Sequence, residues 1–343
     1  MNKVARILVI SVVLALALVI TGAQAQNFLA AVSGSMSGAS QCNVSVYNVA
    51  GGAASVQQSI TVGYNASCVN FLSDGDLIVG QERYQGGSYT NTGVYVVDDY
   101  SYLGGGQWNT TPTEVCVIDG QSYQLSHGIV ADAAGNIYVG MTNYSQNPQI
   151  YKYNATTQTA AQWVSFAAGT AIGDIRIDPT GTTLWCSPVS YGVWNFNLAT
   201  AAHTVQADGG WHNYYGFDIN PVNGNIYGGG YNLTVIDQMS ATTGAGIGYV
   251  AINAHTNYVR SLAFGADWNS DGTPDIYVAD TSAANIQVYS GTNQAYLGTI
   301  TAPASENNLA TWSAPVPEPS SLLVMIPGVA SLLGLAIRKR RMS

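Results

Sequence analysis

Charged residues are scarce in this sequence, and basic residues are the scarcest. Only 8% of the 343 residues are charged, with 10 Lys and Arg against 19 Asp and Glu. Between residues 26 and 316 the basic residues are Arg83, Lys152, Arg176 and Arg260. This part holds 18 of the 19 carboxylates, so its formal charge is 4 - 18 = -14. Because such a surface repels phosphate backbones, nucleic acid is excluded as a partner, whereas divalent cations and neutral or basic partners would be tolerated.

Cysteine and short catalytic motifs are also sparse. The four cysteines are Cys42, Cys68, Cys116 and Cys186. Their spacing matches no compact disulfide scaffold and no zinc motif, so two disulfides in any of three pairings and four buried free thiols both remain open. No G-x-S-x-G elbow, phosphate loop or H-x-x-x-H pair occurs. No reaction class follows from a motif.

The residues that are abundant indicate an all-β exported protein built from repeats. Glycine occurs 38 times and tyrosine 22 times, which argues against helical bundles and coiled coils. Five turn glycines stand 60, 46, 43 and 48 residues apart, at Gly75, Gly135, Gly181, Gly224 and Gly272. An apolar-aromatic strand such as Ile137-Tyr138-Val139 follows each turn, and a second alternating strand comes next. A short inner strand such as His127–Asp132 precedes the turn. Strand units of about 45 residues are typical of β-propeller blades.

Six blades are predicted over residues 26–313. The first unit, with strands near 27–30 and 43–47, lacks an inner strand. We expect Asn308–Trp312 to supply that strand, so that the C-terminal segment closes the ring on the first blade. Seven blades are the alternative, if the long second unit, 68–126, holds a degenerate blade. The repeat pattern resembles NHL-type and related propellers.

The two ends of the chain lie outside the predicted propeller. Residues 1–25 combine Lys3 and Arg6, an apolar run over 7–20 and Ala23-Gln24-Ala25, the pattern of a cleaved signal peptide, with an uncleaved anchor as the alternative. At the other end, 314–320 form a Pro-rich linker and 321–337 are 17 residues without a charge, near the short limit for a transmembrane helix. The basic tail 338–343 then faces the cytoplasm.

The C-terminal order of motifs resembles the PEP-CTERM sorting signal of Gram-negative bacteria. Its parts are Pro317, Glu318 and Pro319, the apolar segment and the basic cluster Arg338, Lys339, Arg340 and Arg341. The resemblance implies processing by an exosortase, which releases the protein or transfers it to the cell surface or extracellular matrix, including a biofilm matrix. The alternative is a permanent C-terminal anchor. In either case the propeller lies outside the cytoplasmic membrane, and signal peptidase and exosortase are its expected partners.

One turn carries additional oxygen ligands. The segment Phe264–Tyr277 resembles the calcium-binding FG-GAP repeat of integrin-like propellers. On that resemblance, side-chain oxygens of Asp267, Asn269, Asp271 and Asp275 and the carbonyl of Thr273 bind a structural calcium ion. The alternative is a solvated acidic turn between strands.

Mixed polar side chains are expected at the mouth of the central channel. Aligning the repeats puts the channel candidates at the starts of successive inner strands: His127, Asp174, Tyr215 and Arg260. They would bind a ligand, act as an acid-base set, or simply provide ordinary channel polarity. The leading prediction is a non-catalytic binding or scaffold module whose partner is an extracellular polysaccharide or a matrix protein. The alternatives are a hydrolase or lyase acting on an extracellular lactone or polysaccharide through His127 and Arg260, and a passive cargo of the sorting tail.

Overall fold

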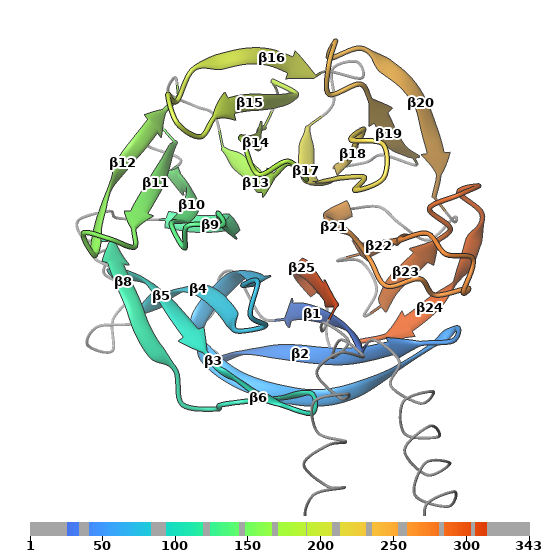
Figure 1. Cartoon of the computed structure of the whole chain (residues 1–343), viewed down its shortest axis with the longest axis horizontal. Coiled ribbons are helices and arrows are strands. Elements are labelled where there is room, and N and C mark those ends of the chain that lie inside the picture. Colours follow the sequence, from blue (N-terminus) through green and yellow to red (C-terminus); the bar gives the residue numbers. More distant parts are fainter. Residues whose placement is uncertain are drawn as a thin grey trace, which may run out of the picture. The chain divides into compact units, whose positions relative to one another are not determined.

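The computed structural model describes residues 26–33, 41–83, 94–118, 124–143, 148–166, 171–189, 191–207, 213–230, 235–252, 259–280, 285–302 and 306–313. Residues 27–312 form one compact unit. Of its 25 strands, 23 form a ring of six four-stranded blades, with one strand shared by two blades, and the other two form a separate hairpin (Figure 1). The prediction of a six-bladed, all-β propeller is therefore confirmed, and the seven-bladed alternative is not.

Each blade runs from an inner strand at the channel to an outer strand at the rim. The inner strands are β25 (Glu306–Ser313), the second half of β3 (Ala53–Phe71), β9 (Gln124–Ala131), β13 (Ile172–Ile177), β17 (Tyr214–Ile219) and β21 (Val259–Gly265). The second strands are β1 (Asn27–Ser33), β4 (Leu77–Arg83), β10 (Ile137–Asn143), β14 (Thr183–Pro188), β18 (Ile226–Gly230) and β22 (Asp275–Asp280). The third strands are β2 (Gln41–Ala50), β5 (Val94–Tyr100), β11 (Gln149–Asn154), β15 (Val193–Asn197), β19 (Val235–Met239) and β23 (Asn285–Tyr289). The outer strands are the first half of β3, β8 (Thr113–Ile118), β12 (Thr159–Ser165), β16 (His203–Ala207), β20 (Gly246–Ala251) and β24 (Tyr296–Thr301).

One long strand belongs to two blades. β3 pairs with β2 between Ala53 and Tyr64 and with β4 between Tyr64 and Phe71. Its first half is the outer strand of blade 1 and its second half the inner strand of blade 2. The two blades therefore form one seven-stranded sheet, in the order β25-β1-β2-β3-β4-β5-β8.

The core lies between blades, which explains the repeated Ile-Tyr-Val sequence. Side chains of a strand alternate between its two faces. In β10, Ile137 and Val139 pack in a cluster with blade 2, whereas Tyr138 packs in a cluster with blade 4. In β22, Ile276 and Val278 likewise face blade 5, and Tyr277 faces blade 1. Each apolar strand is thus buried on both faces by its two neighbours.

The C-terminal strand closes the ring, as the sequence predicted. β25 is the innermost strand of blade 1, beside β1 (Figure 1). Its Trp312 ring stacks on Phe28 of β1 at 5.8 Å between centroids and on Phe71 of β3 at 5.9 Å. Gly75 must be glycine here, because a Cβ atom would come within 2.4 Å of the Trp312 ring and φ is +96°. The closure is therefore held by an aromatic cluster as well as by strand pairing.

The extra length of the second unit forms a small hairpin rather than a degenerate blade. β6 (Tyr102–Gly104) pairs with β7 (Gln107–Trp108) after the third strand of blade 2. Trp108 is buried and donates a hydrogen bond from its indole N–H to the Gly75 carbonyl at 2.8 Å. Tyr102 meets Trp312 edge-on at 5.1 Å. The insertion thus completes the aromatic cluster at the closure.

The four cysteines are buried and form no disulfide. In blade 2, Cys68 pairs with Gly80, Gly80 with Val97, and Val97 with Cys116 across successive strands. Three strand spacings separate these two thiols by about 14 Å, twice the Cα separation of about 7 Å that a disulfide tolerates. Cys42 and Cys186 lie on strands of blades 1 and 4. Of the two possibilities left open by the sequence, the structure has the free thiols.

Candidate functional site

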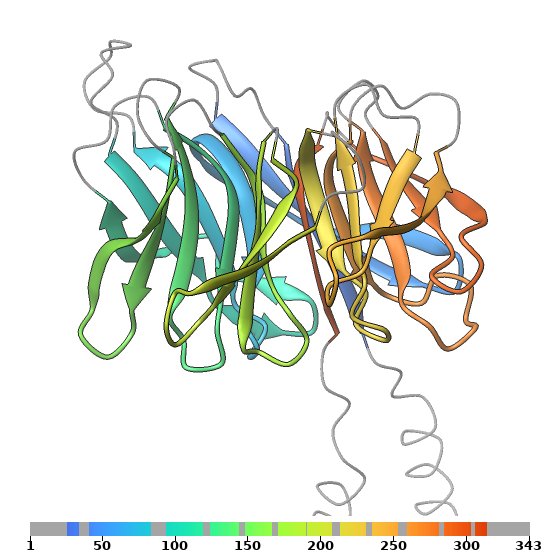
Figure 2. The ribbon, with the colours of Figure 1, turned by 90° about the horizontal axis from the view of Figure 1, so that it is seen from above.

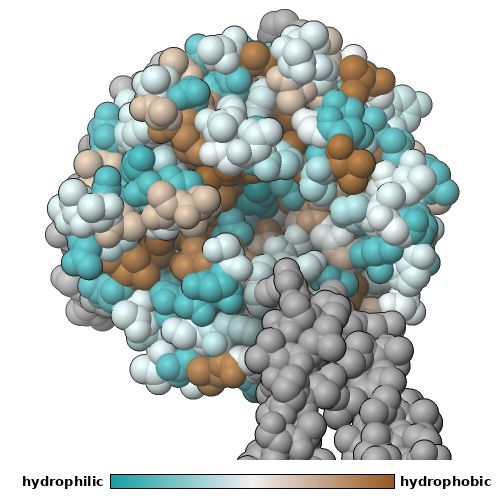
Figure 3. Space-filling view, in the orientation of Figure 1, coloured by the Kyte–Doolittle hydropathy of each residue, from teal (hydrophilic) through white to brown (hydrophobic). Residues whose placement is uncertain are grey.

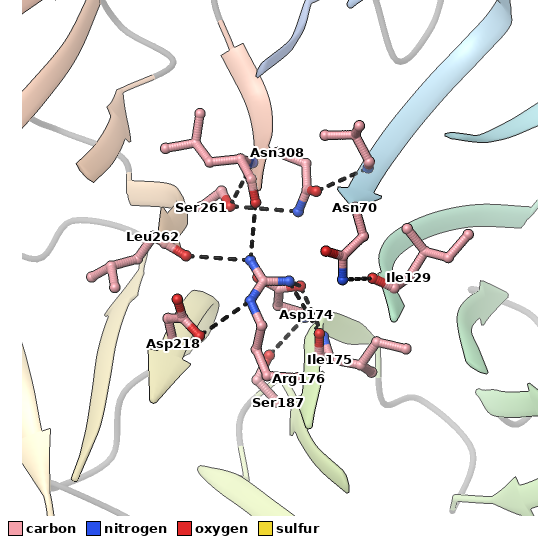
Figure 4. A network of polar contacts seen from close by, with 12 residues as sticks. Asn70, Ile129, Asp174, Ile175, Arg176, Ser187, Asp218, Ser261, Leu262 and Asn308 are labelled. Atoms are coloured by element: carbon pink, nitrogen blue, oxygen red, sulfur yellow. Dashed lines mark hydrogen bonds and ion pairs between the residues drawn. The ribbon is translucent and has the colours of Figure 1, made fainter. Parts of the chain in front are cut away.

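A single arginine crosses the centre of the propeller. Arg176 extends from β13 of blade 4, and its guanidinium reaches the inner strands of three other blades (Figure 4). Its Nη2 donates to the carbonyl of Leu262 in blade 6 at 3.2 Å and to that of Leu309 in blade 1 at 3.3 Å. Its Nε lies 3.5 Å from the Asp218 carboxylate of blade 5. Arg176 therefore connects the closing strand to the opposite side of the ring.

Two carboxylates balance this guanidinium. Asp174 is fully buried and accepts hydrogen bonds from Arg176 Nη1 at 2.9 Å and from the Ile175 N–H at 2.8 Å. Burial raises the pKa of Asp174 to about 8, although Arg176 opposes the shift. Burial also raises the pKa of Asp218, again against the effect of Arg176. Two carboxyl groups thus share one guanidinium in a largely water-excluded site.

Next to this network a cavity of about 720 Å³ opens along the ring axis. It is lined by the ends of the inner strands and by the turns that follow them, including the turns at Gly135 and Gly181. These turns lie on the lower face of the ring in Figure 2. We call this the turn face. Figure 3 looks onto the turn face and shows a hollow at its centre where hydrophilic residues gather.

The cavity wall combines apolar surface with acidic side chains. Its charged lining residues are Asp74, Asp132, Arg176, Asp178 and Asp218. Phe71, Leu72, Ile177 and Pro179 add apolar surface. Four carboxyl groups against one guanidinium give the cavity an acidic character that favours neutral and cationic ligands over anions.

Several of these carboxylates also hold the turns in shape. Asp132 accepts the Asn136 N–H at 2.9 Å, and Asp178 accepts the N–H groups of Thr182 at 3.0 Å and Thr183 at 2.9 Å. A carboxylate satisfies turn N–H groups that would otherwise lack a partner. Both oxygens of Asp132 accept two hydrogen bonds each, so this carboxylate is fully used by its turn. The Asp178 Oδ2 accepts the Thr180 hydroxyl and keeps a second lone pair with which it can contact a ligand.

The four predicted channel residues lie in inner strands, but the structure groups only some of them. The Arg260 guanidinium lies over the Tyr215 ring at 5.2 Å, and both side chains are partly exposed. Asp174 is instead buried in the Arg176 network. His127 belongs to β9, and its side chain is outside the described part of the chain. Among the described lining residues of the cavity, Asp174, Tyr215 and Arg260 do not occur.

The predicted calcium ligands form one turn between β21 and β22. Asp267 accepts backbone N–H groups from Asp271 at 3.0 Å and Gly272 at 2.6 Å. Asp275 is fully buried and accepts the N–H groups of Trp268 at 2.7 Å and Gly291 at 2.9 Å. The partly exposed Asp267 and the exposed Asn269 and Asp271 therefore form the part of this set that an ion would reach, with Asp275 anchoring the turn.

The fit of this turn to calcium is partial. Hydrogen bonds join Asn269 to Asp271 at 3.0 Å, so these side chains lie within reach of one another. Among the described residues, however, no group of three or more His, Cys, Asp or Glu side chains is close enough together to hold a metal ion. Calcium at this turn stays a prediction.

The central arginine is the residue that the sequence reasoning missed. An arginine between two isoleucines of an inner strand, Ile175-Arg176-Ile177, was the available signal. A buried cation in a chain with so few basic residues requires buried acceptors. The acceptors come from strands up to 133 residues away in the chain, so spacing alone did not reveal them.

Fold and site together define the class as a six-bladed β-propeller with an acidic axial cavity. Residues 315–341 match the model of the PEP-CTERM protein-sorting motif. The motif implies export, membrane anchoring before processing, and processing by an exosortase. The sorting residues Pro317 to Pro319 and Arg338 to Arg341 fall inside the match, beyond the described residues.

The comparison with solved structures concerns the fold alone. A chain of the solved structure titled "Crystal Structure of Mitotic Checkpoint Complex" is similar with a TM-score of 0.50 and 14% identity, over 73% of this chain and 67% of that chain. No curated protein matches the sequence. In the part of the chain that the structure describes, no helix is long and apolar enough to cross a membrane. The predicted signal peptide, 1–25, and transmembrane segment, 321–337, lie outside that part.

Proposed function

We propose that this exported, exosortase-sorted propeller is a non-catalytic binding module of the cell surface or extracellular matrix. The observation that supports the proposal is the axial cavity of about 720 Å³ on the turn face. A cavity of this size, with an apolar wall and a few polar groups, suits a small ligand or one unit of a larger one. Its acidic lining favours a sugar unit of a neutral or amino polysaccharide, or a basic side chain of a matrix protein.

The cavity has no catalytic arrangement among its described lining residues. The Arg176 guanidinium makes hydrogen bonds to Asp174 and to three backbone carbonyls, which fixes it as structure. Asp132 and Asp178 are held by turn N–H groups, and the hydroxyls that they accept, from Tyr138 and Thr180, belong to the same turns and strands. General acid-base chemistry needs a nucleophile and a base in reach of one substrate. These contacts support binding over turnover.

Thermal-shift and calorimetric titration of the propeller unit tests the proposal. The ligands are neutral oligosaccharides, amino-oligosaccharides, a lysine-rich peptide, an acidic oligosaccharide and simple lactones. We expect binding of at least one neutral or cationic ligand, no binding of the acidic one and no hydrolysis. Binding to the native state raises its melting temperature by mass action.

Two variants, each with an alanine replaced by tryptophan, test whether the ligand binds in the axial cavity. Ala133 is exposed on a cavity turn, so Ala133→Trp narrows the mouth without touching Arg176. Ala199 is an exposed turn alanine outside the cavity lining, so Ala199→Trp is the matched control. Affinity should fall at least tenfold in the first and stay unchanged in the second. Lactone turnover that is lost in a folded His127→Ala variant would instead support the hydrolase or lyase alternative.

A further inference from the structure

The inner end of the axial cavity, lined by Arg176 and Asp218, carries more negative than positive charge. The Arg176 guanidinium donates hydrogen bonds to Asp174 and to three backbone carbonyls, and its Nε faces Asp218 (Figure 4). Because a guanidinium has five N–H donors, none is left for a ligand. Its single charge is shared by two carboxyl groups. This end of the cavity therefore offers nothing to an anion, and it is one positive charge short when both carboxyls are ionised.

Asp218 keeps an acceptor that a ligand can use. Its Oδ1 accepts the Ile219 N–H at 2.8 Å and lies beside Arg176, and its Oδ2 accepts the Phe264 N–H at 2.7 Å. Since a carboxylate oxygen accepts two hydrogen bonds, Oδ2 keeps one lone pair. The Asp218 side chain is 18% exposed and lines the cavity. A donor group in the cavity can bind here, and a positively charged donor also supplies the missing charge.

Two carboxyl groups that share one cation hold a proton in place of a second cation. Burial raises the pKa of Asp174 to about 8 and also raises the pKa of Asp218. The other charged side chains among the described lining residues are carboxylates as well, so none of them supplies the missing positive charge: Asp74, Asp132 and Asp178. A cationic group beside Asp218 would replace the proton.

The size and the walls of the cavity favour a sugar ring over a lysine side chain. A volume of about 720 Å³ lies in the range of small-molecule sites. A lysine side chain is a narrow, unbranched stem that would leave most of this volume to water. Phe71 and Pro179 provide apolar surface for the C–H groups of a sugar ring, and Ser73 and Asp178 provide polar groups for its hydroxyls.

We propose that the axial cavity binds a sugar unit of an amino polysaccharide, with the ammonium group of the sugar on the Asp218 carboxylate. This inference rests on the proposed function, since it names the ligand of the same cavity. The ammonium group donates to the remaining lone pair of Asp218 and supplies the counter-charge that Arg176 alone does not. The N-acetylated form of the same sugar is uncharged and cannot supply it.

Calorimetric titration of the full chain in a non-ionic detergent tests the inference with a matched pair of probes. These are an oligosaccharide of glucosamine and the same oligosaccharide with its amines acetylated. At a pH of about 6 the free amines are charged. We expect the charged form to bind more tightly by about tenfold or more. Its binding should also release protons, which appear as heats that differ between two buffers of different ionisation enthalpy.

The outcomes separate this inference from the proposed function. Equal or tighter binding of the acetylated form, or binding of the charged form without proton release, overturns the assignment of the ammonium group to Asp218 and leaves the cavity as a binding site. Tighter binding of a lysine-rich peptide overturns the assignment to a sugar. If neither these ligands nor any other of the thermal-shift panel binds, the proposed function fails as well.

A pair of carboxylate variants tests the role of Asp218. Asp218→Asn keeps an oxygen that accepts a backbone N–H but removes the charge. Affinity for the charged oligosaccharide should fall by about tenfold or more, and affinity for the acetylated form should not change. Glu114→Gln is the control, because Glu114 is exposed on β8 outside the cavity lining and its substitution changes the net charge equally.

Melting temperatures show whether both variants fold. Equal affinity of folded Asp218→Asn and Glu114→Gln proteins for the charged oligosaccharide overturns the inference. If Asp218→Asn does not fold, the proton release of the wild type decides.

Discussion

Arg176 is the side chain on which most of the central polar contacts depend. Arg176 is 8% exposed, and its guanidinium links inner strands of blades 4, 5, 6 and 1 (Figure 4). Replacing a buried ion pair by apolar residues on both sides is often tolerated, but removing one partner leaves an uncompensated buried charge. Replacing Arg176 alone should therefore change the free energy of unfolding by a different amount from replacing its carboxylate partners.

Arg176→Met should lower the free energy of unfolding by about 3 to 5 kcal/mol, because Asp174 and Asp218 lose their counter-charge. Urea denaturation measures this change. Lys152→Met is the control, since Lys152 makes only a cation–π contact with Tyr138 at 5.2 Å. Its expected cost is at most about 1 kcal/mol. Similar losses in the two variants would show that Arg176 contributes no more than an ordinary surface cation.

Because Asp174 is buried, the protein should become less stable as the pH rises. A salt-bridged surface carboxylate has the opposite effect. Burial raises its pKa in the native state from 3.8 to about 8. Between these values the native state binds more protons than the unfolded state, so the free energy of unfolding falls as the pH rises. Asp218 acts in the same direction because its pKa is also raised.

Urea denaturation at several pH values between 5 and 8 tests this relation. The wild type should lose stability as the pH rises. Asp174→Asn keeps an oxygen that accepts the Ile175 N–H but cannot ionise, so its stability should fall less steeply over the same interval. An unchanged slope in this variant would mean that Asp174 does not titrate there.

The turn between β21 and β22 connects two blades as well as two strands. Trp268, whose N–H is held by Asp275, packs in the cluster that blades 6 and 1 share. The turn therefore supports the junction at which the ring closes. An ion held by Asp267, Asn269 and Asp271 would stabilise that junction in addition to the hairpin itself.

We propose that calcium binds this turn and predict that it raises the melting temperature. Calcium at 100 times its dissociation constant stabilises the native state by about 2.7 kcal/mol. Asp271→Asn should abolish the shift, and Asp178→Asn, in a turn of blade 4, should leave it intact. Thermal melts in calcium and in chelator provide the measurement. Wild-type and Asp271→Asn proteins that melt alike in both would rule out the site.

The closed ring places the first and last strands in contact, so the position of the chain ends is not essential to the fold. A circular permutant that joins Asn27 to Ser313 by a short Gly-Ser linker, with new ends in the exposed turn at Gly181, should fold to the same structure. The measurement is its circular dichroism spectrum and its melting temperature. A permutant with the new ends inside β10, a buried strand, is the control and should not fold. Failure of the first permutant would show that closure needs the native order of strands.

The sequence by itself determined the sorting motif, the all-β class and the number of blades, whereas the signal peptide stays a prediction. Turn glycines at regular spacing and alternating apolar residues such as Ile137 to Val139 are local signals, readable without knowledge of distant residues. The closing role of Asn308 to Trp312 also followed from the sequence, because the first unit lacked an inner strand. The tail motif Pro317-Glu318-Pro319 was readable for the same reason, as a short contiguous pattern.

Only the tertiary structure decided what the centre of the ring contains. Arg176 bonds to carbonyls 86 and 133 residues further along the chain, and no local pattern encodes such partners. Asp174, predicted at a channel mouth, is buried because Arg176 draws its carboxylate into the network. The axial cavity depends on six inner strands meeting at one axis. Its shape and charge follow from the packing of side chains that are far apart in sequence, so they exist only once the ring has closed.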